Sequence, residues 1–162
     1  MVNTVYYESE VGIVRNSIKS DCFEISKYMR KQDVMEAWSA LKYSPIEMIL
    51  LSFKRSTISM TIERKGFPVA MFGIMADNLA GETAVLWMLS TDGINGIGRI
   101  FVRHSKEFIK DMFKFYPVLY GYVDLRNTVS IKFLTFLGAD WGDTVPYGLE
   151  NKPFRYFKFK RS

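Results

Sequence analysis

A strand, a long helix and a second strand follow one another between residues 83 and 123, and this succession constrains the fold most. Thr83 to Leu89 is a continuous apolar run, as expected of a short strand buried on both faces. A loop over Thr91 to Gly98 leads into a helix expected from Gly98 to Phe115, which Pro117 ends. Val118 to Val123 predicts the second strand. Because a helix crosses between them, the two strands are expected to be parallel, in a mixed sheet covered on both faces.

The flanking segments predict further helices and strands. In chain order they are a strand over 12–19, helices over 21–30, 33–41 and 45–55, a hairpin over 58–62 and 67–76, a helix from Asn127 to Gly138, and strands over 139–141 and 154–159. Ser20 and Asp21 predict the cap of the first helix. Ser44 and Glu47 form a capping box around Pro45. The last strand alternates aromatic and charged residues, which is typical of a protected edge strand.

The composition suits one globular domain over residues 1–162, of class α/β (α+β). It is 48% hydrophobic and 24% charged, which excludes a disordered chain. The net charge of +5 suits an anionic partner without identifying it. A single cysteine, Cys22, excludes an internal disulfide and disfavours a cysteine-based metal site. With no apolar run of membrane-spanning length and no secretory signal over residues 1–10, we expect a cytoplasmic protein and no membrane partner.

Three segments carry a resemblance to a known family. They are Ile13-Val14-Arg15 with Ser20-Asp21, the loop Gly96-Ile97-Gly98, and Asn127 to Ala139 (NTVSIKFLTFLGA). Together with the element order they resemble the GNAT N-acyltransferases, from about Ile13 to Phe159. The resemblance implies a GNAT-like mixed central sheet with helices on both faces.

The resemblance also implies a function and a cosubstrate. A GNAT-type N-acetyltransferase, or an acetyl-coenzyme-A-binding protein, would transfer the acyl group of acetyl-CoA to an amine that attacks the thioester directly. Free N–H groups and glycines at a helix amino terminus suit the pyrophosphate, although the same loop also suits a plain strand-to-helix turn. The residues expected to bind the coenzyme are Met88, Leu89, Ser90, Gly93, Gly96, Ile97, Gly98, Arg99, Arg103 and Asn127.

Two departures from the family pattern support an alternative. Gly93 stands where the family's loop begins with Gln or Arg, and Leu134 stands where a tyrosine often serves as general acid. More narrowly, Trp87 to Asp92 and Leu119 to Ala139 resemble GNAT-like proteins of short-tailed bacteriophages, the internal virion protein A family. The alternative function is therefore a catalytically degenerate phage protein that binds a host or virion partner, in the host cytoplasm or the virion.

Other side chains have both a functional and a structural interpretation. Basic residues recur along one face of the long helix, at Arg99, Arg103, Lys106, Lys110 and Lys114. The first two suit phosphate contacts and the rest a solvated face, while a nucleic-acid surface would need interleaved aromatic residues. His104 fits a surface position better than a general base, and Asp124 fits a turn cap better than a group that deprotonates an amine. Asn127 suits a helix cap and a place beside the coenzyme arm. No catalytic residue is identified.

Overall fold

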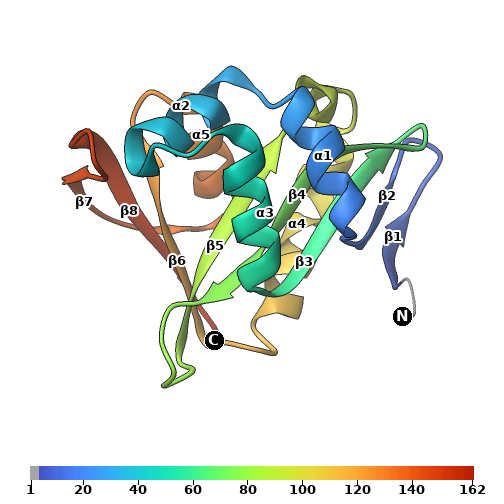
Figure 1. Ribbon diagram of the computed structural model, residues 1–162. Coiled ribbons are helices and arrows are strands. Elements are labelled where there is room, and N and C mark those ends of the chain that lie inside the picture. Colours follow the sequence, from blue (N-terminus) through green and yellow to red (C-terminus); the bar gives the residue numbers. More distant parts are fainter. Residues whose placement is uncertain (1–3) are drawn as a thin grey trace.

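Strands and helices are distributed along residues 4–162, which are the residues that this computed structural model describes (Figure 1). The strands are β1 Val5–Glu8, β2 Ile13–Asn16, β3 Ser56–Arg64, β4 Phe67–Ala76, β5 Thr83–Ser90, β6 Val118–Asp124, β7 Asp140–Tyr147 and β8 Lys152–Lys160. The helices are α1 Lys19–Lys27, α2 Lys31–Leu41, α3 Pro45–Arg55, α4 Gly98–Met112 and α5 Thr128–Leu137, with a short 3-10 helix, η1 Asp92–Gly96, before α4.

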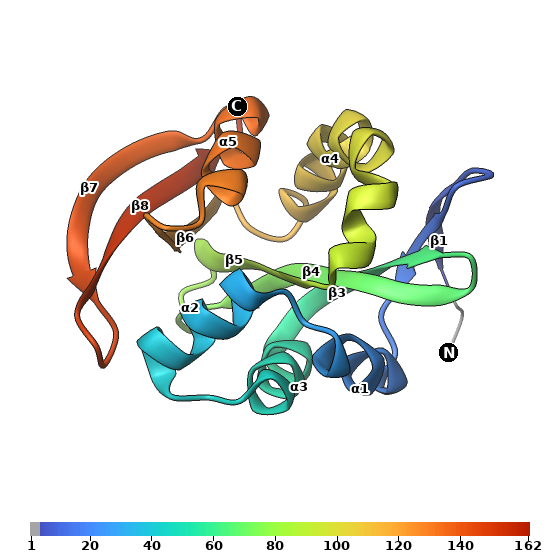
Figure 2. The same cartoon turned by 90° about the horizontal axis from the view of Figure 1, so that it is seen from above.

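The strands form one sheet in the order β1-β2-β3-β4-β5-β6-β8-β7. Among the described strands, β5 and β6 are the only parallel neighbours, and α4 connects them as the sequence predicts. Figure 2 shows α1, α2 and α3 on one face of the sheet and α4 and α5 on the other. The predicted mixed sheet with helices on both faces is therefore confirmed. No helix within residues 4–162 has the length and apolar character needed to cross a membrane.

The parallel strands pair over only a short stretch. Thr83, Ala84 and Val85 of β5 lie opposite Val118, Leu119 and Tyr120 of β6. Beyond this point β5 remains paired with β4 as far as Ser90, and β6 remains paired with β8 as far as Asp124. The two strands therefore diverge toward the end of the sheet where α2 lies (Figure 1).

Two apolar clusters hold the helices against the sheet. On one face Phe72 of β4 packs against Phe101 and Phe108 of α4, with ring centroids 5.4 and 5.6 Å away. On the other face Ile25 of α1 and Ile49 of α3 are fully buried in a cluster with Trp87 and other residues. Burying each such side chain stabilises the fold by roughly 1.5–3 kcal/mol. Both faces of the diverging strands are thus fixed by packed helices.

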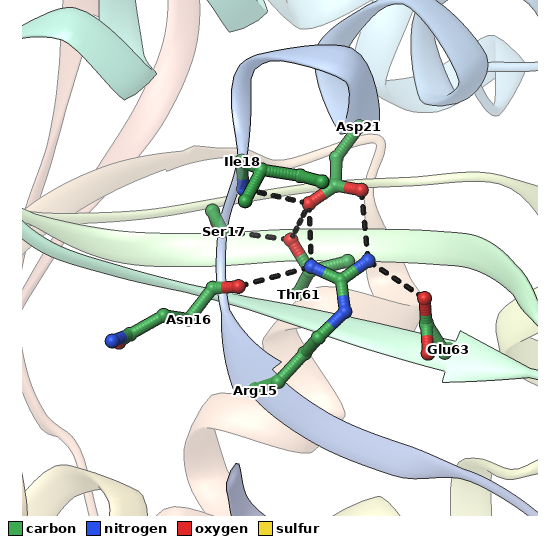
Figure 3. A network of polar contacts seen from close by, with 7 residues as sticks. All are labelled: Arg15, Asn16, Ser17, Ile18, Asp21, Thr61 and Glu63. Carbon is green, nitrogen blue, oxygen red and sulfur yellow. Dashed lines mark hydrogen bonds and ion pairs between the residues drawn. The ribbon is translucent and has the colours of Figure 1, made fainter. Parts of the chain in front are cut away.

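A buried polar network joins β2, β3 and the start of α1 (Figure 3). Arg15 donates two hydrogen bonds of 2.9 Å to Asp21 and one of 2.7 Å to Glu63, and Thr61 donates one of 2.7 Å to Asp21. Asp21 also accepts a hydrogen bond of 2.9 Å from the backbone N–H of Ile18. The network therefore fixes the point at which α1 begins.

This network corrects the predicted cap of α1. Ser20 and Asp21 were expected to precede the helix, but α1 begins at Lys19, and the Ile18 position before it has no capping side chain. Asp21 reaches backward from the first turn to the Ile18 N–H. The carboxylate takes this place because Arg15 and Thr61 bind it from the sheet.

The prediction that the last strand lies at an edge of the sheet is also wrong. The segment over 154–159 belongs to β8, which lies between β6 and β7, so the edge is β7. Strand β7 extends to Tyr147 through Gly142, Asp143 and Pro146, residue types that the expected strand over 139–141 left out. At the other edge, β1 was not predicted at all. It is short and exposed at both ends, and its position depends on pairing with β2.

Candidate functional site

A cavity of about 310 Å³ opens where β5 and β6 diverge. Its lining comes from both sides of the sheet, with Ala37 and Ala40 of α2 on one side and Phe108 of α4 and Leu134 of α5 on the other. Most of the lining is apolar. A ligand can therefore occupy the interior of the molecule between two central strands, in contact with residues from both helical layers.

The backbone of β5 supplies one wall of this cavity. Met88 and Leu89 line it. The N–H of Ser90 points away from β4 and donates a hydrogen bond of 2.9 Å to Asp33, and the Ser90 hydroxyl also contacts Asp33, at 3.3 Å. Because N–H groups alternate between the two edges of a strand, the Met88 N–H shares the edge of the Ser90 N–H and faces the gap between β5 and β6. Of these three residues, Met88 is placed to donate to a ligand in the cavity.

The loop after β5 is fixed by hydrogen bonds at its start, whereas its end, at Gly98, has free space beside the backbone. Thr91 binds the backbone of Val69 through its N–H at 2.8 Å and accepts a hydrogen bond of 3.1 Å from the Gly93 N–H. Ile97, buried before α4, provides no side chain that caps the helix. A Cβ on Gly98 would meet no atom within 4 Å, whereas one on Gly96 would meet the guanidinium of Arg64. The start of α4 thus offers room for a ligand atom close to the backbone at Gly98.

The basic face of α4 divides into two halves. Arg99 and Arg103, near the loop, are exposed and form no ion pair with any residue in 4–162. Lys110 pairs with Glu107 at 3.0 Å and Lys114 with Asp111 at 2.6 Å. Lys106, in the middle of the helix, also forms no ion pair with residues 4–162 and lies over the Phe136 ring. Two of these three unpaired basic residues, Arg99 and Arg103, are thus at the end of the helix next to the glycine loop.

Asn127 caps α5, as the sequence predicts, and also reaches across to α2. Its Oδ1 accepts a hydrogen bond of 3.3 Å from the Ser130 N–H, and its Nδ2 donates one of 2.9 Å to Oε1 of Glu36. The residue is only 3% exposed. Asn127 therefore connects the two helical layers at the open end of the sheet.

Glu36 is the side chain that the sequence analysis did not identify. It lies on α2, lines the cavity and accepts the hydrogen bond from Asn127. Burial raises the pKa of Glu36 to about 7; the hydrogen bond from Asn127 lowers it in part, and the negative charges of Asp33 and Asp124 raise it further. The cavity thus contains a carboxyl group that changes its charge near neutral pH.

Two arginines neutralise the acidic residues around Glu36. Arg30 pairs with Asp33 at 3.0 Å. Asp124 is 1% exposed and accepts hydrogen bonds from the backbone N–H of Arg126, at 2.8 Å, and from its guanidinium. Burial alone would raise the pKa of Asp124, but the bonds from Arg126 lower it overall. Asp124 therefore has the turn-capping role that the sequence favours.

A signal for Glu36 was present in the sequence. Asp33, Glu36 and Ala40 are spaced as residues on one face of a helix, and the buried Ala37 marks that face as the inner one. Acidic residues on the inner face of a helix require partners or a function. The partners, Arg30, Ser90 and Asn127, are apparent only once the chain is folded.

Leu134 and His104 occupy different parts of the molecule. Leu134 lines the cavity, so the residue at the family's tyrosine position is beside the candidate site but has no proton to donate. His104 packs against Tyr7 with ring centroids 4.0 Å apart, on the side of α4 that faces β1. It does not line the cavity between β5 and β6.

The turn between β7 and β8 closes the open end of the sheet against α2. Leu149 N donates to Ala40 O at 2.9 Å, Glu150 N to Ser39 O at 3.1 Å, and Lys42 pairs with Glu150 at 3.0 Å. Tyr147, next to this turn, lines the cavity. At the end of the sheet where β5 and β6 are apart, the β7–β8 turn and α2 therefore connect the two halves of the sheet.

Solved structures match this arrangement over nearly the whole chain, whereas no family model and no curated protein matches its sequence. A GNAT-family acetyltransferase from Bacillus anthracis has a TM-score of 0.67 and 13% identity, covering 94% of this chain and 96% of its own. A spermidine N-acetyltransferase from Vibrio cholerae, solved with CoA and spermine, has 0.69 and 13%, with 94% and 96% covered. A ribosomal-protein-S5-alanine acetyltransferase from Vibrio fischeri has 0.66 and 17%, with 98% and 97% covered.

The comparisons give no support to the narrower resemblance to bacteriophage virion proteins. They agree with the observed topology, in which a mixed sheet opens between two parallel strands joined by a helix. The chain has the fold of the GNAT acetyltransferases.

Proposed function

We propose that this protein is an N-acetyltransferase that binds acetyl-CoA between β5 and β6 and transfers the acetyl group to an amine. The observation that carries the proposal is the cavity that opens where these strands diverge. It is mostly apolar and lies where β5 and β6 are no longer paired with each other, which suits a thioester arm. The CoA and spermine in the Vibrio cholerae structure support the same two classes of ligand.

The amino terminus of α4 would hold the pyrophosphate. Its backbone N–H groups carry the positive end of the helix dipole, and Ile97 offers no competing cap. No atom of the protein lies within 4 Å of the place where a Cβ of Gly98 would be, which would let a ligand approach the backbone closely there. Arg99 and Arg103 add positive charge on the same side.

The Met88 N–H would polarise the thioester carbonyl. A backbone donor facing the carbonyl oxygen stabilises the negative charge that develops there when an amine attacks, and removing one such donor typically costs about 2.7–4 kcal/mol of the barrier. With Leu134 at the tyrosine position, no general acid is supplied by α5 to the leaving thiolate. We therefore expect slow transfer, driven by the proximity of amine and thioester.

Binding of acetyl-CoA provides the test. Titration calorimetry with the wild-type protein should show saturable binding, and Gly98→Asp should abolish it, because a carboxylate would occupy the phosphate position. Asn95→Asp, on the exposed η1 of the same loop, is the matched control for added charge. Absence of binding to the wild-type protein at millimolar acetyl-CoA would contradict the proposal.

A further inference from the structure

The cavity between β5 and β6 contains one negative charge without a cationic partner. Two carboxylates line it, those of Asp33 and Glu36. Asp33 pairs with Arg30 at 3.0 Å and accepts the Ser90 N–H at 2.9 Å. Glu36 receives only the neutral Asn127 amide among side chains, and within residues 4–162 it forms no ion pair.

The other polar groups around Glu36 are either neutral or paired with an opposite charge. Asp124 and Arg126, after β6, neutralise each other. Tyr147 of β7 lines the cavity, and burial raises its pKa, so it stays neutral at physiological pH. Tyr122 of β6 stacks on Tyr147 with ring centroids 4.5 Å apart. Glu36 is therefore the group whose charge a ligand would have to match.

Much of the cavity wall on the α2 and α3 side is apolar. Ala37, Ala40 and Leu41 of α2 and Met48 of α3 line the same side of the cavity. A ligand here would place one positive charge at Glu36 and an uncharged, apolar body along these side chains. A polyamine would bring additional positive charges into this region with no carboxylate left to receive them.

We propose that Glu36 binds the acceptor as a single ammonium group and removes its proton, and that the acceptor is a monoamine on an apolar or aromatic carrier. This inference rests on the function proposed above. Glu36 contacts the reacting nitrogen in this scheme, so its role is catalytic. Asn127 is a positioning residue, because it holds the carboxylate through Oε1. The backbone of Asp124 also hydrogen bonds to this carboxylate and helps to fix its orientation.

The chemical step balances with the groups that are present. The carboxylate of Glu36 takes one proton from the ammonium, and the nitrogen lone pair then attacks the thioester carbon. The C–N bond forms and the C–S bond breaks, which releases the thiolate. The second proton passes from nitrogen to the thiolate, giving the free thiol and the amide, and Glu36 returns its proton to water.

Glu36→Gln tests this role, with Glu24→Gln as the control. Glu24 is an exposed carboxylate on α1, paired with Lys27. With acetyl-CoA and phenethylamine at pH 7, we expect Glu36→Gln to lower kcat/KM by about 10²–10⁴-fold, the usual contribution of a general base. The wild-type kcat/KM should bend near pH 7, and this bend should disappear in Glu36→Gln. Coenzyme affinity should be unchanged in both variants.

Equilibrium binding gives a readout independent of turnover. Calorimetry at pH 8 should show phenethylamine binding to the wild-type protein and to Glu24→Gln but not to Glu36→Gln. Transfer by the wild-type protein with less than a threefold loss in Glu36→Gln would overturn the role of Glu36, and better turnover of spermidine than of phenethylamine would overturn the acceptor class. Failure of the wild-type protein to bind acetyl-CoA is a separate result, which overturns the proposed function and this inference with it.

Discussion

The side-chain amide of Asn127 donates a hydrogen bond of 2.9 Å to the Glu36 carboxylate, although 91 positions separate the two residues in the sequence. The same amide caps α5 through its oxygen. The start of one helix is thereby coupled to the protonation of a carboxyl group on another. A change at position 127 will affect both, and the two effects can be separated by the choice of substitution.

Asn127→Asp should raise the pKa of Glu36. The aspartate keeps a capping oxygen for the Ser130 N–H, but it replaces a hydrogen-bond donor with a second negative charge beside Glu36, and both changes favour the protonated carboxyl. We expect the bend in the pH profile of kcat/KM to move above 7 by about one unit or more. Asn127→Ser keeps a capping oxygen without the charge and should move the bend less. A bend that moves downward in Asn127→Asp would contradict the coupling.

Glu36→Gln should stabilise the protein at high pH. With a pKa of about 7 in the folded state against an ordinary 4.5, Glu36 keeps its proton between these values while the unfolded chain loses it. Rising pH over this window therefore destabilises the wild-type fold, by at most about 3 kcal/mol above pH 7. Denaturant unfolding should show a stability difference between variant and wild type that opens from pH 4.5 to 7. A constant difference across that range would be inconsistent with a raised pKa.

Arg15→Met should destabilise the fold strongly. The substitution leaves Asp21, which is 3% exposed, as a buried charge without its partner, at a cost of about 3–5 kcal/mol. The control is Lys27→Met, which removes an exposed pair with Glu24 and should change the free energy of unfolding by less than about 1 kcal/mol. Equal effects of the two substitutions would show that the network in Figure 3 has no special energetic role.

Gly148→Ala should loosen the contact between the β7–β8 turn and α2. Gly148 has a φ of +70°, and its Cβ would lie 2.3 Å from the Ala40 Cα. Gly66→Ala is the matched control, because Gly66 has a φ of +80° with no atom within 4 Å of the added carbon. The control should cost about 1–2 kcal/mol from backbone strain alone, and Gly148→Ala should cost clearly more. Thermal unfolding of the two variants side by side measures the difference.

Arg103→Ala should weaken acetyl-CoA binding in a salt-dependent way. An exposed arginine contributes about 0.2–1 kcal/mol to a charge pair, so the Kd should rise by no more than about fivefold. The loss should be greater at low ionic strength, where screening is weaker and charges interact over longer distances. The control is Lys114→Ala, which should leave the Kd unchanged, because Lys114 lies just beyond the far end of α4 and pairs with Asp111.

The sequence predicted the central architecture because that architecture depends on local signals. The apolar run of β5, the long helix after Gly98 and the cap at Asn127 are each specified by neighbouring residues, and all three are present. The capping box at Ser44 and Glu47 is also confirmed, with Ser44 N–H donating to the Glu47 carboxylate at 2.8 Å.

The remaining features depend on contacts between distant segments. Asp21 changes its place relative to α1 because Arg15 and Thr61 bind it, and β8 lies inside the sheet because β7 pairs along its outer edge. The helical spacing marks Glu36 as an inward-facing carboxylate, but its partner Asn127 is identified only when α2 is placed beside α5. No spacing within one helix reveals that a residue 91 positions away will contact it.

The short parallel pairing of β5 with β6 has a mechanical consequence. Three residue pairs join the half-sheet β1–β5 to the half-sheet β6–β8–β7, and the contact of the β7–β8 turn with α2 closes the far end. The two half-sheets therefore share a short stretch of strand pairing at one end and the contact of the β7–β8 turn with α2 at the other. A ligand in the cavity between β5 and β6 would act on this contact between the turn and α2. We therefore expect its binding to change the hydrogen-exchange rates of the Leu149 and Glu150 N–H groups.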